Sequence, residues 1–142
     1  MIMDHKLKLM VVDDSPLFRT WLIRSLSEDD RFQVVGYAVN ALDAQEKIPL
    51  LQPDMLTLDI EMPGMSGIDF LKQLLPVHPI PVILVSSLNL RVFDALEAGA
   101  VDFVRKPDEA NGLSKEIFLS MLRSKLMVAA ASHVHLPSVP AD

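Results

Sequence analysis

The sequence predicts an α/β fold in which parallel strands are joined by crossover helices. Apolar, strand-like runs alternate with helical patterns about five times along the chain, which is the order typical of a parallel sheet. Charged or hydroxyl side chains follow four of these runs, directly or one residue later: Asp13, Asp14, Asp59, Ser86 and Lys106. Because a parallel sheet collects the carboxyl ends of its strands along one edge, we expect these side chains to meet in one pocket.

Composition places the chain among globular proteins of one domain. It has 142 residues, of which 50% are hydrophobic and 23% are charged, enough for a real core in a single unit. A net charge of -6 and the lack of basic runs argue against a nucleic-acid surface. The chain has no cysteine, no signal-peptide pattern and no apolar stretch of spanning length. We therefore expect a cytoplasmic protein that contacts neither membrane nor nucleic acid.

The first expected strand covers residues 7–12, and a helix should follow it. Ser15 can cap the helix and Pro16 suits its first position. Apolar residues recur every four positions in this helix and predict one buried face: Phe18, Leu22 and Leu26. Arg19 is expected on a solvated face. The next strand is predicted at 32–38.

Asn40 is expected to cap a second helix that runs through Lys47 and ends near Pro49 and Pro53, because proline disrupts a helix interior. A third strand is predicted at 55–58. It is followed by Asp59, a turn-rich loop at 62–67 and a helix at 68–75.

The remaining elements are a strand at 81–85, a short helix, a strand at 100–104 and a long final helix. Asn89 is expected to cap the short helix and Gly99 to close it in a left-handed conformation. The final helix should begin near Ser114 and stop after Ala131, before a tail. Three of its residues are expected to face inward: Ile117, Met121 and Leu122.

Several motifs resemble the receiver domains of two-component response regulators, and within that family the receiver of chemotaxis methylesterases (CheB). They are residues 57–63 (Thr-Leu-Asp-Ile-Glu-Met-Pro), 85–88 (Val-Ser-Ser-Leu) and 98–104 (Ala-Gly-Ala-Val-Asp-Phe-Val), with Lys106-Pro107 after the last. The resemblance implies a receiver domain at 6–126 and a helix extension with a linker or tail at 127–142. It also implies a flavodoxin-like, doubly wound, five-stranded parallel sheet with strand order 2-1-3-4-5.

The same resemblance implies a role for each residue of the expected pocket. Asp59 would be the phospho-acceptor, Asp13 and Asp14 the acidic pair for the metal, and Lys106 the active-site lysine. Ser86 would be the switch hydroxyl, moving toward the phosphoryl group and drawing the fourth loop inward. Phe103 stands where receivers carry a switching aromatic, but a phenylalanine in a strand is also ordinary core, and both interpretations stay open here.

The chemistry of these residues supports a magnesium-dependent reaction. Like charges at about 4 Å cost roughly 4 kcal/mol per pair in a partly screened site, so an incoming phosphoryl group needs a cation. Mg²⁺ prefers oxygen ligands, which Asp14, Asp59 and the backbone carbonyl of Glu61 can supply, with Asp13 acting partly through water. Lys106 places a point charge against the remaining phosphate oxygens. The product is an acyl phosphate on a carboxylate.

Simpler explanations exist for each residue alone. An Asp-Asp-Ser-Pro string is a common helix cap, Asp59 and Ser86 can cap turns, and Lys106-Pro107 can be a solvated loop. Chemically matched groups at four strand ends, however, have no shared structural reason to be there. We therefore expect a site.

The resemblance also implies the partners. A CheA-like sensor histidine kinase would be the phosphodonor, and an output domain or partner protein would bind the face formed by the fourth helix, the fifth strand and the fifth helix. The fourth helix is expected to be about one turn shorter than in CheB-type receivers. No Gly-x-Ser-x-Gly motif is present. We therefore expect the chain itself to be no enzyme beyond self-phosphorylation. It is expected to be either a stand-alone receiver or part of a CheB-like protein, in which the missing domain would be a protein-glutamate methylesterase.

Two other functions are compatible with the predicted fold. An unphosphorylated scaffold would keep the receiver fold and bind partners, but would be expected to have an incomplete acidic set. A flavodoxin-like cofactor binder would need a hydroxyl-rich or glycine-rich phosphate loop after the first strand, where Asp13 and Asp14 instead repel phosphate.

Overall fold

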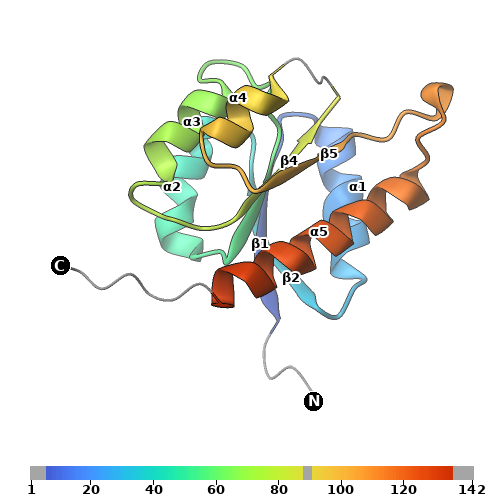
Figure 1. Ribbon diagram of the computed structural model, residues 1–142, viewed down its shortest axis with the longest axis horizontal. Helices are drawn as coiled ribbons and strands as arrows, with labels where there is room; N and C mark the ends of the chain where they lie inside the picture. The colour runs from blue at the N-terminus through green and yellow to red at the C-terminus, as the bar shows by residue number, and fades with distance from the viewer. Residues whose placement is uncertain (1–5, 88–90, 136–142) are drawn as a thin grey trace.

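The computed structural model describes residues 6–87 and 91–135, and it contains a five-stranded, all-parallel sheet with helices on both faces (Figure 1). The strand order is β2-β1-β3-β4-β5, which confirms the predicted topology. The strands have the following bounds: β1 Leu7–Val12, β2 Phe32–Ala38, β3 Met55–Leu58, β4 Val82–Ser86 and β5 Asp102–Arg105.

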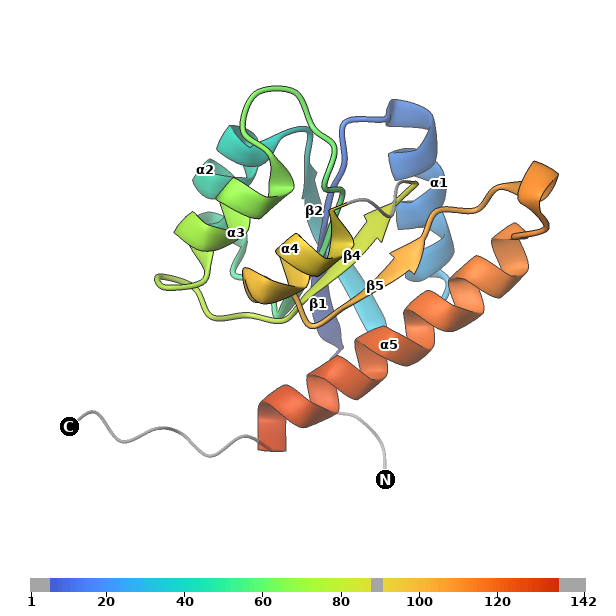
Figure 2. The ribbon, with the colours of Figure 1, turned by 45° about the horizontal axis from the view of Figure 1, so that its top comes forward.

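Five α-helices connect and follow these strands. Their bounds are α1 Pro16–Ser27, α2 Ala41–Leu51, α3 Gly67–Leu74, α4 Val92–Glu97 and α5 Lys115–His135, with a 3-10 turn at Glu109–Asn111. Helices α2, α3 and α4 cover one face of the sheet, and α1 and α5 cover the other (Figure 2). None of the helices in the described ranges is long and apolar enough to span a membrane.

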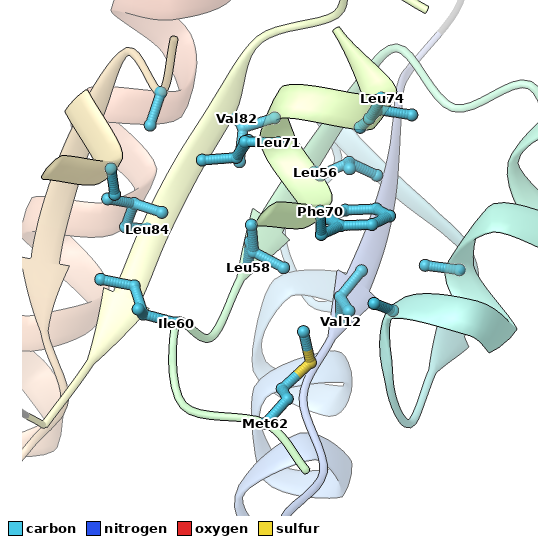
Figure 3. Packing of buried hydrophobic residues seen from close by; sticks show 14 of the residues in the cluster. Val12, Leu56, Leu58, Ile60, Met62, Phe70, Leu71, Leu74, Val82 and Leu84 are labelled. Carbon is cyan, nitrogen blue, oxygen red and sulfur yellow. The ribbon is translucent and has the colours of Figure 1, made fainter. Parts of the chain in front are cut away.

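The core consists of two layers, one on each side of the sheet. Strand side chains alternate between the layers, so Met10 and Val12 pack toward α2 and α3 while Leu9 and Val11 pack toward α1 and α5. The first layer surrounds Phe70 and Leu71 of α3 (Figure 3). Central strands buried on both faces are expected in a doubly wound sheet.

Two helix starts match the sequence expectations. The Ser15 hydroxyl accepts a hydrogen bond from the Phe18 N–H, with Pro16 in the first helical position, and the Asn40 side chain accepts one from the Asp43 N–H at 2.8 Å. Gly99 has the expected positive φ of 118°. The predicted cap at Asn89 lies outside the described residues, and Arg91 precedes α4 without a side-chain cap.

The end of α2 differs from the prediction. The helix continues through Pro49 and ends at Leu51, with Gln52 in a left-handed conformation. Pro49 lies on the exposed side of the helix, where water can satisfy the carbonyl group that loses its N–H partner. Ile48 is buried against the sheet, so packing holds this last turn despite the proline.

The inward face of α5 was also predicted wrongly. Ile117 and Met121 are 49% and 41% exposed, and only Leu122 of the three expected residues is buried. The buried stripe is instead Phe118, Leu122, Leu126 and Ala129. Two apolar stripes compete on this helix, and the one that carries the larger Phe118 side chain buries more apolar surface.

Helix α5 is longer than expected, because it continues past Ala131 to His135. Ala129 and Ala130 pack against the sheet layer, and no proline or glycine interrupts the helix before Pro137. The predicted domain boundary after Leu126 therefore falls inside a continuous helix. Residues 136–142, part of the predicted tail, lie outside the described residues.

Candidate functional site

Three carboxylates meet at the carboxyl ends of β1 and β3. Asp13, Asp14 and Asp59 each present an oxygen, and these oxygens lie within 4.8 Å of one another. Asp13 and Asp59 are buried, whereas Asp14 is exposed. The expected meeting of these three side chains is therefore observed, and their crowding creates a strong demand for positive charge.

Backbone pairing that continues past the strand ends brings these residues together. Val12 is paired with Leu58 in the parallel ladder. One residue later, the Asp59 N–H donates to the Val12 carbonyl at 3.0 Å, and the Asp13 N–H donates to the Ala38 carbonyl at 3.0 Å. The two aspartates thus lie side by side because their strands end in register.

Each buried aspartate uses one of its oxygens in a local turn. Oδ1 of Asp13 accepts from the Ser15 N–H at 2.8 Å, and Oδ1 of Asp59 accepts from the Glu61 N–H at 3.0 Å. Such side-chain-to-backbone bonds fix the carboxylate plane. Both Oδ2 atoms are then directed at the same cation, the ammonium of Lys106.

Lys106 supplies the one positive charge in contact with these carboxylates among the described residues. Its Nζ lies 3.0 Å from Oδ2 of Asp13 and 3.3 Å from Oδ2 of Asp59. The same atom lies 4.6 Å from the ring centre of Phe18. One ammonium cannot balance three carboxylates, so the site retains an excess of negative charge.

Burial raises the pKa of Asp59 from 3.8 to about 6, even though the Lys106 ammonium and the Glu61 N–H stabilise its charged form. The side chain is almost completely removed from water, and a charged carboxylate loses its hydration there. The neighbouring Asp13 charge raises the pKa further. The site therefore takes up a proton or a cation more readily than an exposed aspartate does.

This raised pKa predicts how stability depends on pH in metal-free buffer. Between about pH 4 and pH 6 the folded chain binds more protons at Asp59 than the unfolded chain, so the Asp59 contribution to the free energy of unfolding falls as pH rises. We expect Asp59→Asn to gain about 2 kcal/mol relative to wild type between pH 4 and pH 7. Urea denaturation at both pH values tests this, and an equal difference at both would contradict it.

Ser86 is the last residue of β4, and it is buried next to Lys106. Its backbone carbonyl accepts from the Lys106 N–H at 2.9 Å, and it is paired with Arg105 in the ladder. The ends of β4 and β5 are thereby tied together. This arrangement brings the predicted hydroxyl and the predicted lysine to the same edge as the aspartates.

The sequence left the roles of Phe103 and Glu61 at the site open, and the structure shows where each residue lies. Phe103 is partly buried in β5 and packs against the layer formed by α2, α3 and α4, and its carbonyl accepts from the Lys125 ammonium at 2.8 Å. Both its core and its switch interpretations are compatible with this position. Glu61 is exposed, and the N–H that it presents to Asp59 is its described contact with the site.

Gly67 allows the loop after Asp59 to close tightly against α3. A Cβ atom at this position would lie 2.8 Å from Cα of Ile60 and 3.1 Å from the Asp59 carbonyl oxygen. The Gly67 N–H also donates to the Ile60 carbonyl at 3.0 Å. A side chain here would displace the backbone that carries Asp59.

Two residues of α1 that the sequence did not predict to be near the site contact it. Arg19, expected to be solvated, donates from Nη1 to the Asp13 carbonyl at 2.9 Å and lies 4.6 Å from the ring centre of Tyr37. Phe18, expected as core, faces the Lys106 ammonium. The sequence did contain a sign of this placement. The predicted helix begins only three residues after Asp13, so its first turn must lie at the edge of the sheet that carries the site.

Comparison with known proteins decides the family. Residues 9–118 match the family described as the response regulator receiver domain. The chain belongs to this family. A solved structure that resembles this receiver is the response regulator domain of Thermotoga maritima CheB, with a TM-score of 0.81 and 37% identity. The similarity covers 89% of this chain and 98% of that one.

Full-length relatives of the receiver are methylesterases. Over 130 residues the chain is 46% identical to protein-glutamate methylesterase/protein-glutamine glutaminase 2 of Syntrophomonas wolfei, covering 92% of this chain but 38% of that relative. The chain is also similar to a chain in the crystal structure of the P1 domain of CheA3 in complex with CheY6 from R. sphaeroides. The identity is 29% and the TM-score is 0.69. The similarity covers 86% of this chain and 97% of the matched one. The family assignment argues against a flavodoxin-like cofactor binder.

Proposed function

We propose that this receiver domain is a phosphorylation switch, phosphorylated on Asp59 in a Mg²⁺-dependent reaction. The observation that carries the proposal is the geometry of Asp59. Its carboxylate is buried, one oxygen is held by the Glu61 N–H, and the other faces Lys106 beside two further carboxylates. A scaffold without phosphorylation has no need for this complete and mutually repelling set.

The acidic cluster fits a hard divalent cation. Asp13, Asp14, Asp59 and the backbone carbonyl of Glu61 would hold Mg²⁺, which prefers oxygen ligands and keeps several waters. The three carboxylate oxygens already lie within 4.8 Å of one another, and the exposed Asp14 leaves the cluster accessible from solvent. Bound there, the ion would offset the negative charge of an incoming phosphoryl group.

The proposed reaction is a single displacement at phosphorus. The Oδ2 atom of Asp59 forms a bond to phosphorus as the bond to the donor breaks, and the donor leaves with the electron pair. The product is an acyl phosphate. Lys106, already 3.3 Å from that oxygen, would then pair with phosphate oxygens.

We infer a histidine kinase of the CheA type as the phosphodonor, by analogy with the solved complex of CheA3 P1 and CheY6. The output would be a methylesterase domain, as in the longer relative, or a separate partner. We propose the α4-β5-α5 face as the binding surface, because apolar side chains are exposed there: Phe93, Val101 and Met121. Residues 6–126 would be the switching unit, acting in the cytoplasm.

The test of this function is covalent labelling of the wild-type chain. Incubation with acetyl phosphate and Mg²⁺ should add one phosphoryl group, detected by intact-mass measurement. The same incubation with a chelator should leave the mass unchanged, because the crowded carboxylates repel the donor without a cation. Failure to gain mass with Mg²⁺ would contradict the function and favour the scaffold alternative.

A separate prediction concerns the switch. Ser86→Ala should still be phosphorylated, because its hydroxyl is proposed to act after transfer by hydrogen-bonding the phosphoryl group. With beryllium fluoride, which mimics that group, wild type should show amide shifts by NMR across α4 and β5. Ser86→Ala should show a much smaller response. An undiminished response would mean that the signal leaves the site by another route.

A further inference from the structure

We propose that Phe18 is the positioning residue for Lys106, holding its ammonium over the ring face so that it stays at the site throughout phosphoryl transfer. This inference rests on the proposed function for its role in the reaction. The placement itself rests on geometry: Nζ of Lys106 lies 4.6 Å from the ring centre, a distance at which the ring quadrupole attracts a cation.

The ring cannot easily move away from the ammonium, because an aromatic cluster supports it. Phe18 packs against Trp21 and Phe118 with ring centres 5.7 and 5.8 Å away, and those two rings lie 5.9 Å apart. Phe118 belongs to the buried stripe of α5 and is fully buried. Such tilted and edge-to-face contacts fix ring orientation, so Phe18 presents a defined surface to Lys106.

The ring contact differs from the other two contacts of the ammonium in one respect. Asp13 and Asp59 hold Lys106 through charge, and both carboxylates change partners in the proposed reaction, since Asp59 becomes an acyl phosphate and Asp13 faces a cation. The Phe18 ring does not change its charge. It can therefore keep the lysine in place while the ion pairs rearrange.

A leucine at this position would fill similar apolar space without offering a ring face. Phe18→Leu is therefore the informative change, and Phe18→Tyr, which keeps the ring, is its matched control. Phe18→Met serves as a second ring-free variant if the leucine side chain packs poorly in the cluster. Trp21 fluorescence and thermal melts verify that each variant is folded.

The first measurement is the NMR shift of the Lys106 ε-methylene protons, which does not depend on phosphorylation. In wild type and Phe18→Tyr, the ring current should move these protons upfield of the corresponding protons of Lys72, which has no described ring contact. The other ring-facing lysines, which lie over different rings, are not used as the reference: Lys47, Lys115 and Lys125. The shift should be lost in Phe18→Leu and Phe18→Met. Unshifted Lys106 protons in wild type would overturn the placement, whatever the outcome of phosphorylation.

The second measurement is a double-mutant cycle in urea denaturation, with Phe18→Leu, Lys106→Met and the double variant. If the ring holds the ammonium, Phe18→Leu should destabilise the Lys106→Met variant less than it destabilises wild type. The difference should correspond to about a threefold change in the unfolding equilibrium constant. Strictly additive losses would show that Phe18 acts only as core and would overturn the coupling.

The third measurement tests the role in the reaction. Phe18→Leu should lower the rate of phosphorylation by acetyl phosphate by about threefold, the factor expected for the coupling between the ring and the ammonium, whereas Phe18→Tyr should match wild type. Equal rates for both variants and wild type would overturn the positioning role. A wild type that takes up no phosphoryl group, but shows the ring-current shift, would instead contradict the proposed function and leave the placement standing.

Discussion

Asp59→Asn should accept no phosphoryl group from acetyl phosphate in the presence of Mg²⁺. The amide oxygen is a poor nucleophile, and no acyl phosphate can form at that side chain. Intact-mass measurement should show one added group on wild type and none on the variant. The matched control is Asp30→Asn, which changes an exposed aspartate in the turn between α1 and β2 and should be labelled like wild type.

The fold of Asp59→Asn is not expected to suffer, so loss of labelling cannot be attributed to unfolding. Burial disfavours the Asp59 charge, and at neutral pH the uncharged asparagine removes that penalty. Lys106 keeps its ion pair with Asp13 at 3.0 Å. Equal labelling of Asp59→Asn and wild type would show that another residue is the acceptor.

Asp14→Ala should lose Mg²⁺ binding, with affinity reduced on the order of 100-fold. Asp14 is the exposed member of the cluster, so its removal takes away a ligand without opening a cavity. It should also relieve like-charge repulsion, leaving the metal-free fold as stable as wild type or more so. Thermal melts with and without millimolar Mg²⁺ measure both effects.

The control for this prediction is Asp30→Ala, which removes an exposed carboxylate far from the cluster in the fold. Mg²⁺ should stabilise that variant as it stabilises wild type. If Asp14→Ala were stabilised to the same extent, Asp14 would not be a ligand, and the cation would have to rely on the two buried aspartates.

The strands and the edge that carries the site could be predicted from sequence because the signals are local. Apolar runs of strand length end at charged or hydroxyl residues, and Ser15 and Asn40 mark helix starts by a hydrogen bond within three residues. Parallel topology then places Asp59 and Lys106 together without further information. Their 3.3 Å contact follows from the order of the elements.

The parts that were missed depend on contacts between elements. Periodicity alone could not choose between the two apolar stripes of α5, because the choice follows from how Phe118 fits under the sheet. Nor could it show that Pro49 would be tolerated on an exposed helix side, or that Phe18 would face Lys106 rather than only the core. These outcomes depend on tertiary packing, which overrides local preference.

The direction of the carboxylates was equally beyond sequence reasoning. An aspartate after a strand can cap a turn or bind a ligand, and the sequence alone does not choose between these two roles. In the structure Oδ1 of Asp59 accepts from the Glu61 N–H in the turn, and Oδ2 remains available to face Lys106. The turn thus orients the oxygen that is proposed to react.

The central claim, that Asp59 is the residue that carries the phosphoryl group, is tested most directly by mapping the modified site. Wild type is phosphorylated with acetyl phosphate and Mg²⁺, the acyl phosphate is reduced with borohydride, and the peptides are sequenced by mass spectrometry. We predict that the reduced residue is Asp59 alone. Reduction at Asp13, at Asp14 or at any exposed carboxylate, with Asp59 unmodified, would contradict the account.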